Sequence, residues 1–168
     1  TAMIRNIKLL AAEAKALGCA LWIGEYGGIA DDAGITAYMD ANYDGVAAVA
    51  GSQMYWDYSK GGGYAPMDAA GKEKEALMDG IVRPFPMRVA GSPESYAFDE
   101  KSSTFTLTYI PKLTITAPTL ISVPSRVYPS GYKVSCGGCS YLDSGSGLLT
   151  ISKPPADLPA TITVTPKS

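Results

Sequence analysis

LWIGEYGG, residues 21–28, is a mostly apolar run in which a carboxylate, Glu25, comes shortly before two glycines. An apolar run of this length bounded by turn residues predicts a β-strand buried on both faces of its sheet. A glutamate at the C-terminal end of such a strand lies where parallel α/β folds place their catalytic groups. The alternative is a glutamate in an ion pair at the rim of the sheet, and position alone does not separate the two.

Helical patterns lie on both sides of this strand. Apolar residues recur at spacings of three and four through residues 2–17, and Gly18 is a suitable C-terminal stop, so we expect a helix there. A second helix is expected from Asp31 and Asp32 to Gly51, because aspartate is favourable at a helix N-terminus. A second strand, residues 53–58, ends in aromatic and polar groups, and a short charged helix follows at residues 72–79. The apolar stripe of the first helix comprises Met3, Ile7, Leu10, Ala14 and Leu17.

The order helix, strand, helix, strand, helix predicts that residues 1–86 are the C-terminal portion of a larger (β/α)8 TIM barrel. Two parallel strands alone leave unpaired edges and cannot close a sheet. The remaining strands are therefore expected on another polypeptide or on an upstream segment.

The pattern changes in residues 87–168, where helical periodicity disappears and β-type residues, proline and serine predominate. Short β-type runs separated by turn residues predict a small antiparallel β-sandwich, so the fold class is α/β plus β. The expected strands are Phe105–Ile110, Leu120–Val123, Tyr132–Ser135, Ser140–Leu142, Leu148–Ile151 and Thr161–Thr165.

Composition excludes several functional classes. The net charge is −2 over 168 residues with both signs interspersed, which argues against a nucleic-acid surface. No apolar run approaches the roughly 18 residues that a membrane-spanning helix needs. The sequence has no histidine, so Ser/His/Asp and Cys/His nucleophile systems and most zinc sites are excluded within this chain.

Three cysteines remain to be assigned. Cys136 and Cys139 have the spacing of a redox or metal motif, but no second Cys/His pair completes a zinc site. We expect either a small disulfide across a tight turn or two free thiols. Cys19 lies between a helix and an apolar strand and is expected to be a packed apolar residue.

Several segments together resemble a known family. WIGEYG (22–27) and YWDYS (55–59) are similar to the seventh- and eighth-strand segments of glycoside hydrolase family 5, a family of (β/α)8-barrel retaining glycosidases. RPFP (83–86), VAG (89–91) and YAFD (96–99) resemble a narrower group, the endoglycosylceramidases and related actinobacterial endoglycosidases, in which a β-sandwich follows the barrel. The resemblance covers residues 1–110 and extends to the sandwich only by architecture.

The resemblance implies that Glu25 is the nucleophile of a retaining glycosidase and that Trp56 is the floor of the adjacent sugar subsite. The apolar face of a sugar stacks well on an indole, which suits Trp56, although a buried core tryptophan is the alternative. Tyr26 and Tyr58 are further candidates for substrate contact, with packing as the equal alternative. No metal or organic cofactor is needed for this chemistry.

Retaining hydrolysis needs a second carboxyl group, about 5–5.5 Å from the first, to protonate the leaving oxygen. In the family this acid/base glutamate follows the fourth strand, usually in an Asn-Glu pair, which this sequence lacks. We therefore expect the chain alone to be inactive. It would be the C-terminal fragment of a nicked enzyme whose N-terminal fragment carries the acid/base residue, and a start at Thr1, just before a helix, fits cleavage in a loop.

The expected activity is hydrolysis of the linkage between an oligosaccharide and the ceramide of glycosphingolipids, by a secreted bacterial enzyme that contacts membrane lipid peripherally. One rival is a family 5 β-glucanase or β-glucosidase acting on substrates without lipid. Another is a non-catalytic fragment whose sandwich binds carbohydrate or membrane. The absence of tryptophan from residues 87–168 argues against a sugar-stacking surface on the sandwich.

Overall fold

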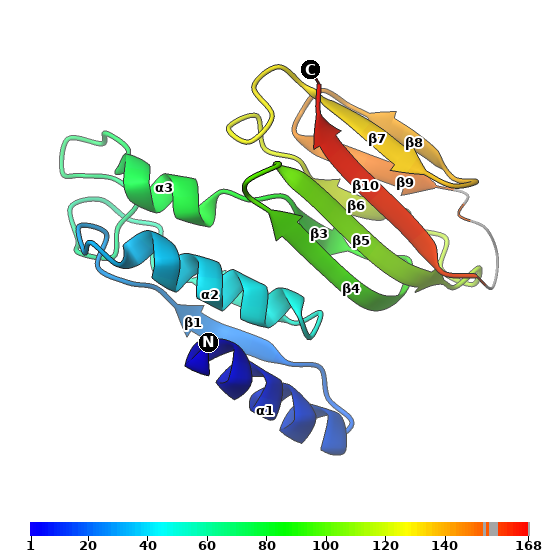
Figure 1. Ribbon diagram of the computed structural model, residues 1–168, viewed down its shortest axis with the longest axis horizontal. Coiled ribbons are helices and arrows are strands. Elements are labelled where there is room, and N and C mark those ends of the chain that lie inside the picture. The colour runs from blue at the N-terminus through cyan, green and yellow to red at the C-terminus, as the bar shows by residue number, and fades with distance from the viewer. Residues whose placement is uncertain (153, 155–157, 168) are drawn as a thin grey trace. The chain divides into compact units, whose positions relative to one another are not determined.

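In the computed structural model, which describes residues 1–152, 154 and 158–167, the chain divides after Val82 into two units (Figure 1). The sequence places this boundary four residues later, after Pro86. The difference arises because Phe85 already begins a strand of the second unit. No helix in the described part of the chain is long and apolar enough to cross a membrane.

The first unit contains three helices and two strands in the expected order. They are α1 (Ala2–Ala16), β1 (Trp22–Tyr26), α2 (Ile35–Ala47), β2 (Ser52–Tyr55) and α3 (Glu75–Ile81). The second helix starts later than expected, because Asp32 precedes it in a turn and its carboxylate accepts a hydrogen bond from the Gly34 N–H at 2.7 Å. The third helix lies at 75–81 instead of 72–79.

The two strands pair in parallel and form a two-stranded sheet, and a barrel is not evident in these 168 residues. A cluster centred on Tyr26, Met39 and Leu77 packs α2 and α3 against one face of the sheet. The expectation that β1 is buried on both faces is wrong for the described residues, since Trp22 and Glu25 are exposed. With one neighbouring strand and helices packed on one face, half of the strand has nothing to cover it.

The apolar stripe of α1 is partly uncovered. Ile7 is buried, but Leu10 and Leu17 are 48% and 80% exposed. Ile7 packs close to α2 at Gly45, where a Cβ atom would lie 2.5 Å from its Cδ1, so the glycine that weakens α2 also permits this contact. Cys19 is a free, exposed thiol, contrary to the packed position expected for it.

The second unit is a β-sandwich of two antiparallel sheets (Figure 1), and each sheet contains four of the described strands. One sheet has the order β4-β5-β10-β7 and the other the order β3-β6-β9-β8. The six strands expected from the sequence are all present. The strand bounds are Phe85–Arg88 (β3), Gly91–Asp99 (β4), Thr104–Pro111 (β5), Thr119–Ser122 (β6), Tyr132–Cys136 (β7), Ser140–Asp143 (β8), Leu148–Ser152 (β9) and Ala160–Pro166 (β10).

Alternating residues of the inner strands build the sandwich core. Phe105, Leu107 and Tyr109 of β5 are fully buried, and they pack with residues of β6, β9 and β10. The Tyr109 hydroxyl is buried and has no hydrogen-bond partner among the described residues. The Tyr109 side chain therefore contributes to the core through apolar packing and not through a hydrogen bond.

Two strands, β3 and β4, are absent from the sequence expectations. Pro86 and Pro93 lie within them, and proline cannot donate a hydrogen bond to a neighbouring strand. Both strands are at the edge of their sheets, and irregular pairing occurs at both positions, between Pro86 and Arg88 and between Pro93 and Ser95. An edge strand with a bulge tolerates proline, but a single sequence does not show which strands are at an edge.

Cys136 and Cys139 form a disulfide at the turn between β7 and β8, with their Cα atoms 5.7 Å apart. The disulfide alternative is therefore the correct one of the two. The pair closes a four-residue turn in the sandwich and has no place in a metal site.

Candidate active site

A bulge in β1 determines where Glu25 lies. Ile23 pairs with Gln53 and Tyr26 with Tyr55, so β1 contains one residue more than β2 over this interval. In a regular strand Glu25 would share a face with Ile23, because side chains alternate. The extra residue allows both Ile23 and Tyr26 to pack against the core, while Glu25 is exposed. Bulges reorient side chains in this way and are frequent beside active sites.

Trp56, the residue after β2, is tied to the end of β1 by the backbone. Its N–H donates to the carbonyl oxygen of Tyr26 at 2.7 Å, so the peptide group between Tyr26 and Gly27 is held against it. The Trp56 side chain is 54% exposed, and its peptide bond to Asp57 is cis. The structure thus brings Glu25 and Trp56 to adjacent strand ends with both side chains exposed.

Gly27 makes this close approach of the two strand ends possible. A Cβ atom at Gly27 would overlap the carbonyl oxygen of Trp56 and would lie 2.9 Å from Cδ1 of Tyr64. Residue 27 must therefore be glycine, because the backbone of Trp56 occupies the space that a side chain would need.

We expect Gly27→Ala to lower the free energy of unfolding by about 1–3 kcal/mol, because the backbone at Trp56 must move away from the added methyl group. Gly24→Ala in the same strand is the matched control, since a Cβ there meets nothing within 4 Å. Urea denaturation of the two purified variants measures the difference. Equal stability of both variants would show that the Gly27 contact does not constrain the strand ends.

Tyr26 is buried in the core, which is the packing alternative and not the substrate contact expected beside it. It is buried, and its ring makes edge contacts with the rings of Tyr43 and Tyr55 at centroid distances of 5.7 and 5.5 Å. Its hydroxyl donates to the Tyr43 hydroxyl at 2.6 Å. Because of the bulge, the residue directly after Glu25 points into the core.

Tyr55 also faces the core side, as alternation along β2 predicts. Its hydroxyl donates to the carbonyl oxygen of Tyr64 at 2.6 Å. Burial, and secondarily the negative charge of Asp57, raises the pKa of Tyr55 to about 12, so the hydroxyl stays protonated and keeps donating at neutral pH. Tyr55 therefore ties the end of β2 to the loop at Tyr64.

Tyr58 is 85% exposed, which leaves its side chain available for contact with a substrate. The loop that follows, with glycines at 61–63, is held in place by the rest of the unit. Its Gly63 carbonyl accepts from the Ala30 N–H at 2.8 Å, and its Gly62 carbonyl accepts from the Lys74 ammonium group at 2.9 Å. The loops after β1 and β2 are thus joined next to the strand ends.

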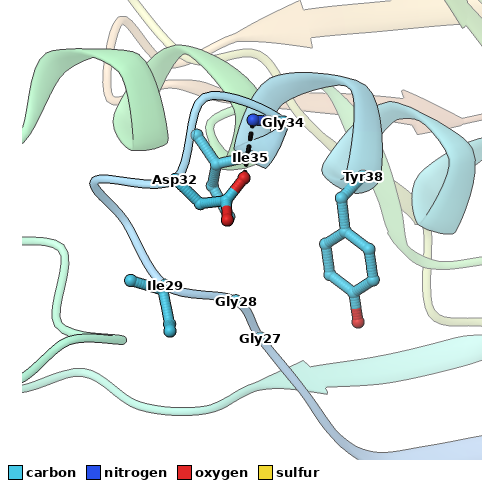
Figure 2. A pocket seen from close by; sticks show the side chains of 7 residues that line it. All are labelled: Gly27, Gly28, Ile29, Asp32, Gly34, Ile35 and Tyr38. Atoms are coloured by element: carbon cyan, nitrogen blue, oxygen red, sulfur yellow. Dashed lines mark hydrogen bonds between the residues drawn. The ribbon is translucent and has the colours of Figure 1, made fainter.

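An open cavity of about 310 Å³ lies between the loop after β1 and the start of α2 (Figure 2). Glycine backbone and apolar side chains make up most of its wall, and Ile29 is 55% exposed there. The carboxylate of Asp32 already accepts a hydrogen bond from the Gly34 N–H, as the dashed line in Figure 2 shows. The lining residues are Gly27, Gly28, Ile29, Asp32, Gly34, Ile35 and Tyr38.

The arrangement supplies one exposed carboxylate beside one exposed indole. Within residues 1–152, 154 and 158–167, no group of three or more His, Cys, Asp or Glu side chains is placed to hold a metal ion. A carboxylate in this position can act as a nucleophile or as a base, and an indole can stack against a flat apolar ligand face.

Glu25, Trp56 and Tyr58 are exposed at or after the strand ends, and Tyr43, whose hydroxyl contacts that of Tyr26, was not expected from the sequence. The apolar periodicity of the second helix gave no reason to expect a hydroxyl contact with Tyr26. The bulge in β1 that turns Tyr26 toward Tyr43 was also not predicted, because one sequence contains no signal for a register shift between parallel strands.

A comparison with protein-family models matches the second unit of the chain. Residues 83–165 match the model of the glycoside hydrolase family 5 C-terminal domain. No curated protein sequence matches the chain.

Solved structures match over almost the whole chain. Endo-glycoceramidase II from Rhodococcus sp., solved as its lactosyl-enzyme intermediate, is 29% identical with a TM-score of 0.76, over 94% of this chain and 36% of that one. The structure of its complex with ganglioside GM3 is 28% identical with the same TM-score, and the match covers 94% of this chain and 34% of that one. Sterylglucosidase 1 from Cryptococcus neoformans, solved with tris, shares the fold at 16% identity and a TM-score of 0.71. This match covers 95% of this chain and 31% of that one. The chain thus spans about a third of the length of the structures it matches.

Proposed function

Because this chain corresponds to the C-terminal part of a glycoside hydrolase family 5 enzyme, we propose that it supplies the nucleophile and a sugar platform to a retaining endo-β-glycosidase acting on glycosphingolipids. The observation that carries the proposal is the pair of exposed side chains at adjacent strand ends, Glu25 and Trp56. Support for the substrate class comes from the similarity to endo-glycoceramidase II.

In the proposed reaction the Glu25 carboxylate attacks the anomeric carbon as the bond from that carbon to the leaving oxygen breaks. A second carboxylic acid protonates the leaving oxygen, so the aglycone departs with its hydroxyl group. Water, deprotonated by the same second residue, then hydrolyses the ester between the sugar and Glu25. Exposure of Glu25 on the bulge suits the first step, because the carboxylate must reach a substrate from outside the core.

Trp56 would form the floor under the sugar that Glu25 attacks. Its indole is exposed, and its backbone N–H donates to the carbonyl of Tyr26, so the two strand ends that carry the indole and the carboxylate are joined by a hydrogen bond. Tyr58, two residues further on, is proposed to border the same subsite.

The acid/base carboxyl is proposed to come from a separate N-terminal fragment that completes a (β/α)8 barrel with the first unit. Two features support this. The two parallel strands have no further strand beside them among the described residues, and the apolar residues Leu10 and Leu17 of α1 are exposed. An apolar helix stripe of this kind is normally covered by a neighbouring element.

The aglycone is proposed to be ceramide, and the enzyme to be secreted by a bacterium and to meet its substrate at a lipid surface. The test uses the complete enzyme with lactosylceramide, ganglioside GM3 and an aryl β-cellobioside, under one detergent condition. We expect release of intact oligosaccharide from both glycolipids and a lower kcat/KM for the cellobioside. Turnover of the cellobioside with no release from either glycolipid would favour a β-glucanase or β-glucosidase of the same family and would refute the ceramide assignment.

A further inference from the structure

We propose that Tyr43 of α2 is a positioning residue for catalysis: through Tyr26 it holds the β1 bulge that presents Glu25. The inference rests on the proposed function, in which Glu25 is the nucleophile. It adds a role for a residue 18 positions away from Glu25 in the sequence and on a different element.

A directed pair of hydrogen bonds connects β1, α2 and α3. The Tyr26 hydroxyl donates to the Tyr43 hydroxyl at 2.6 Å, and the Tyr43 hydroxyl donates to the carbonyl oxygen of Ile81 at 2.9 Å. Ile81 is the last residue of α3, and carbonyl groups at a helix C-terminus have no partner within the helix. Tyr43 therefore accepts from the strand and donates to an oxygen that the helix leaves available.

Ring packing fixes the same contact from two sides. The Tyr26 ring meets the rings of Tyr43 and Tyr55 edge-on, with interplanar angles of 88° and 82°. Edge-to-face pairs of this kind are favourable, at about 0.5–1.5 kcal/mol each beyond their area burial, so they favour this ring orientation. The Tyr26 side chain is consequently held in the core by both its ring and its hydroxyl.

Fixing Tyr26 fixes Glu25, because adjacent residues of a strand point to opposite faces. The bulge is the register in which Tyr26 points inward and Glu25 outward. A one-residue slip would reverse both side chains and turn the carboxylate toward the core. The hydroxyl of Tyr43 meets that of Tyr26 only in the bulged register, so this hydrogen bond opposes the slip.

The test is Tyr43→Phe in the complete enzyme, which keeps the ring and removes the hydroxyl. A small displacement of a reacting group can cost up to about 100-fold in rate, and we expect kcat to fall about tenfold with KM within about twofold of the wild type. Tyr26→Phe removes the same hydrogen bond from the strand side and should give the same loss. The double variant should be no slower than Tyr43→Phe, because that change alone already removes the hydrogen bond between the two hydroxyl groups.

Tyr109→Phe in the sandwich core is the matched control, since it deletes a buried hydroxyl that has no partner among the described residues. Its kcat should equal that of the wild type. All rates are measured at a temperature where circular dichroism shows every variant folded, so that a stability effect does not change kcat. If Tyr43→Phe is not recovered folded, Tyr26→Phe decides by the same criteria.

An unchanged kcat in Tyr43→Phe, or losses that multiply in the double variant, would overturn the inference. Glu25→Gln, assayed in parallel, separates this result from failure of the proposed function. If Glu25→Gln is inactive while Tyr43→Phe keeps the wild-type kcat, only the positioning role is lost. If Glu25→Gln retains wild-type turnover, the proposed function itself fails.

Discussion

Replacing Glu25 with glutamine in the complete enzyme is expected to lower turnover at least about 1,000-fold, in line with removal of nucleophiles from other enzymes. The amide keeps the shape of the side chain but cannot attack the anomeric carbon as a carboxylate does. Glu25 is exposed, so the change removes no core packing and the melting temperature should not move. Initial rates with lactosylceramide and thermal unfolding followed by circular dichroism measure the two quantities.

Glu94→Gln is the control for this experiment. Glu94 is an exposed glutamate of β4 in the sandwich, and the substitution makes the same change in charge and shape. Its turnover should match the wild type. A Glu25→Gln enzyme that keeps more than about a tenth of the wild-type rate would exclude the nucleophile role.

The second large effect is expected for Trp56→Ala. Loss of an indole that stacks under a sugar should cost about 2 kcal/mol, which is about 30-fold in kcat/KM. The side chain is already 54% exposed, so its removal should change the unfolding temperature much less than it changes the rate. Steady-state kinetics and thermal unfolding of the same preparation test both statements.

Trp56→Phe separates stacking from a general effect on the strand end. Phenylalanine retains a flat apolar face and should recover most of the lost kcat/KM. The backbone bond from Trp56 to the carbonyl of Tyr26 is available to any side chain except proline, so both variants keep it. If alanine and phenylalanine at this position gave the wild-type rate, the platform assignment would be wrong.

The order of elements in the first unit, and that of the second unit from β5 onward, was predictable from the sequence pattern. Apolar spacing predicts a helix at 2–17, which the structure has at 2–16, and β-type runs between turn residues predict six of the sandwich strands. Edge strands escaped prediction because their prolines argue against pairing in a sheet centre, and the sequence does not show where the edges are. Helix starts shifted because a polar cap such as Asp32 can close a turn before the helix begins.

The exposed residues at the strand ends could be predicted from the sequence, but the core residues that pack behind them could not. Glu25 and Trp56 stand at strand ends, which the sequence shows. For Tyr26, its place at the strand end left substrate contact and packing as equal alternatives, and regular alternation from Ile23 would place it on the face opposite to Ile23. The register shift that buries Tyr26 depends on pairing between Ile23 and Gln53, a long-range property that no local pattern encodes.

Burial was the least predictable property of the first unit. Leu10, Leu17 and Trp22 have the spacing or composition of core residues and are exposed in this chain. Hydrophobic pattern shows which face an element buries, but not whether the element that covers it is part of the same chain. For this reason the predicted barrel stays a proposal that depends on a second fragment.

The central claim, that Glu25 is a retaining nucleophile, is tested most directly by trapping the covalent intermediate. The complete enzyme is denatured during turnover of a slowly hydrolysed activated lactoside, digested, and examined by tandem mass spectrometry. We expect the mass of one lactosyl group on the peptide that contains Glu25, with fragmentation placing it on that residue. A lactosyl group on any other residue, or an unlabelled enzyme that nevertheless turns over the lactoside, would contradict the account.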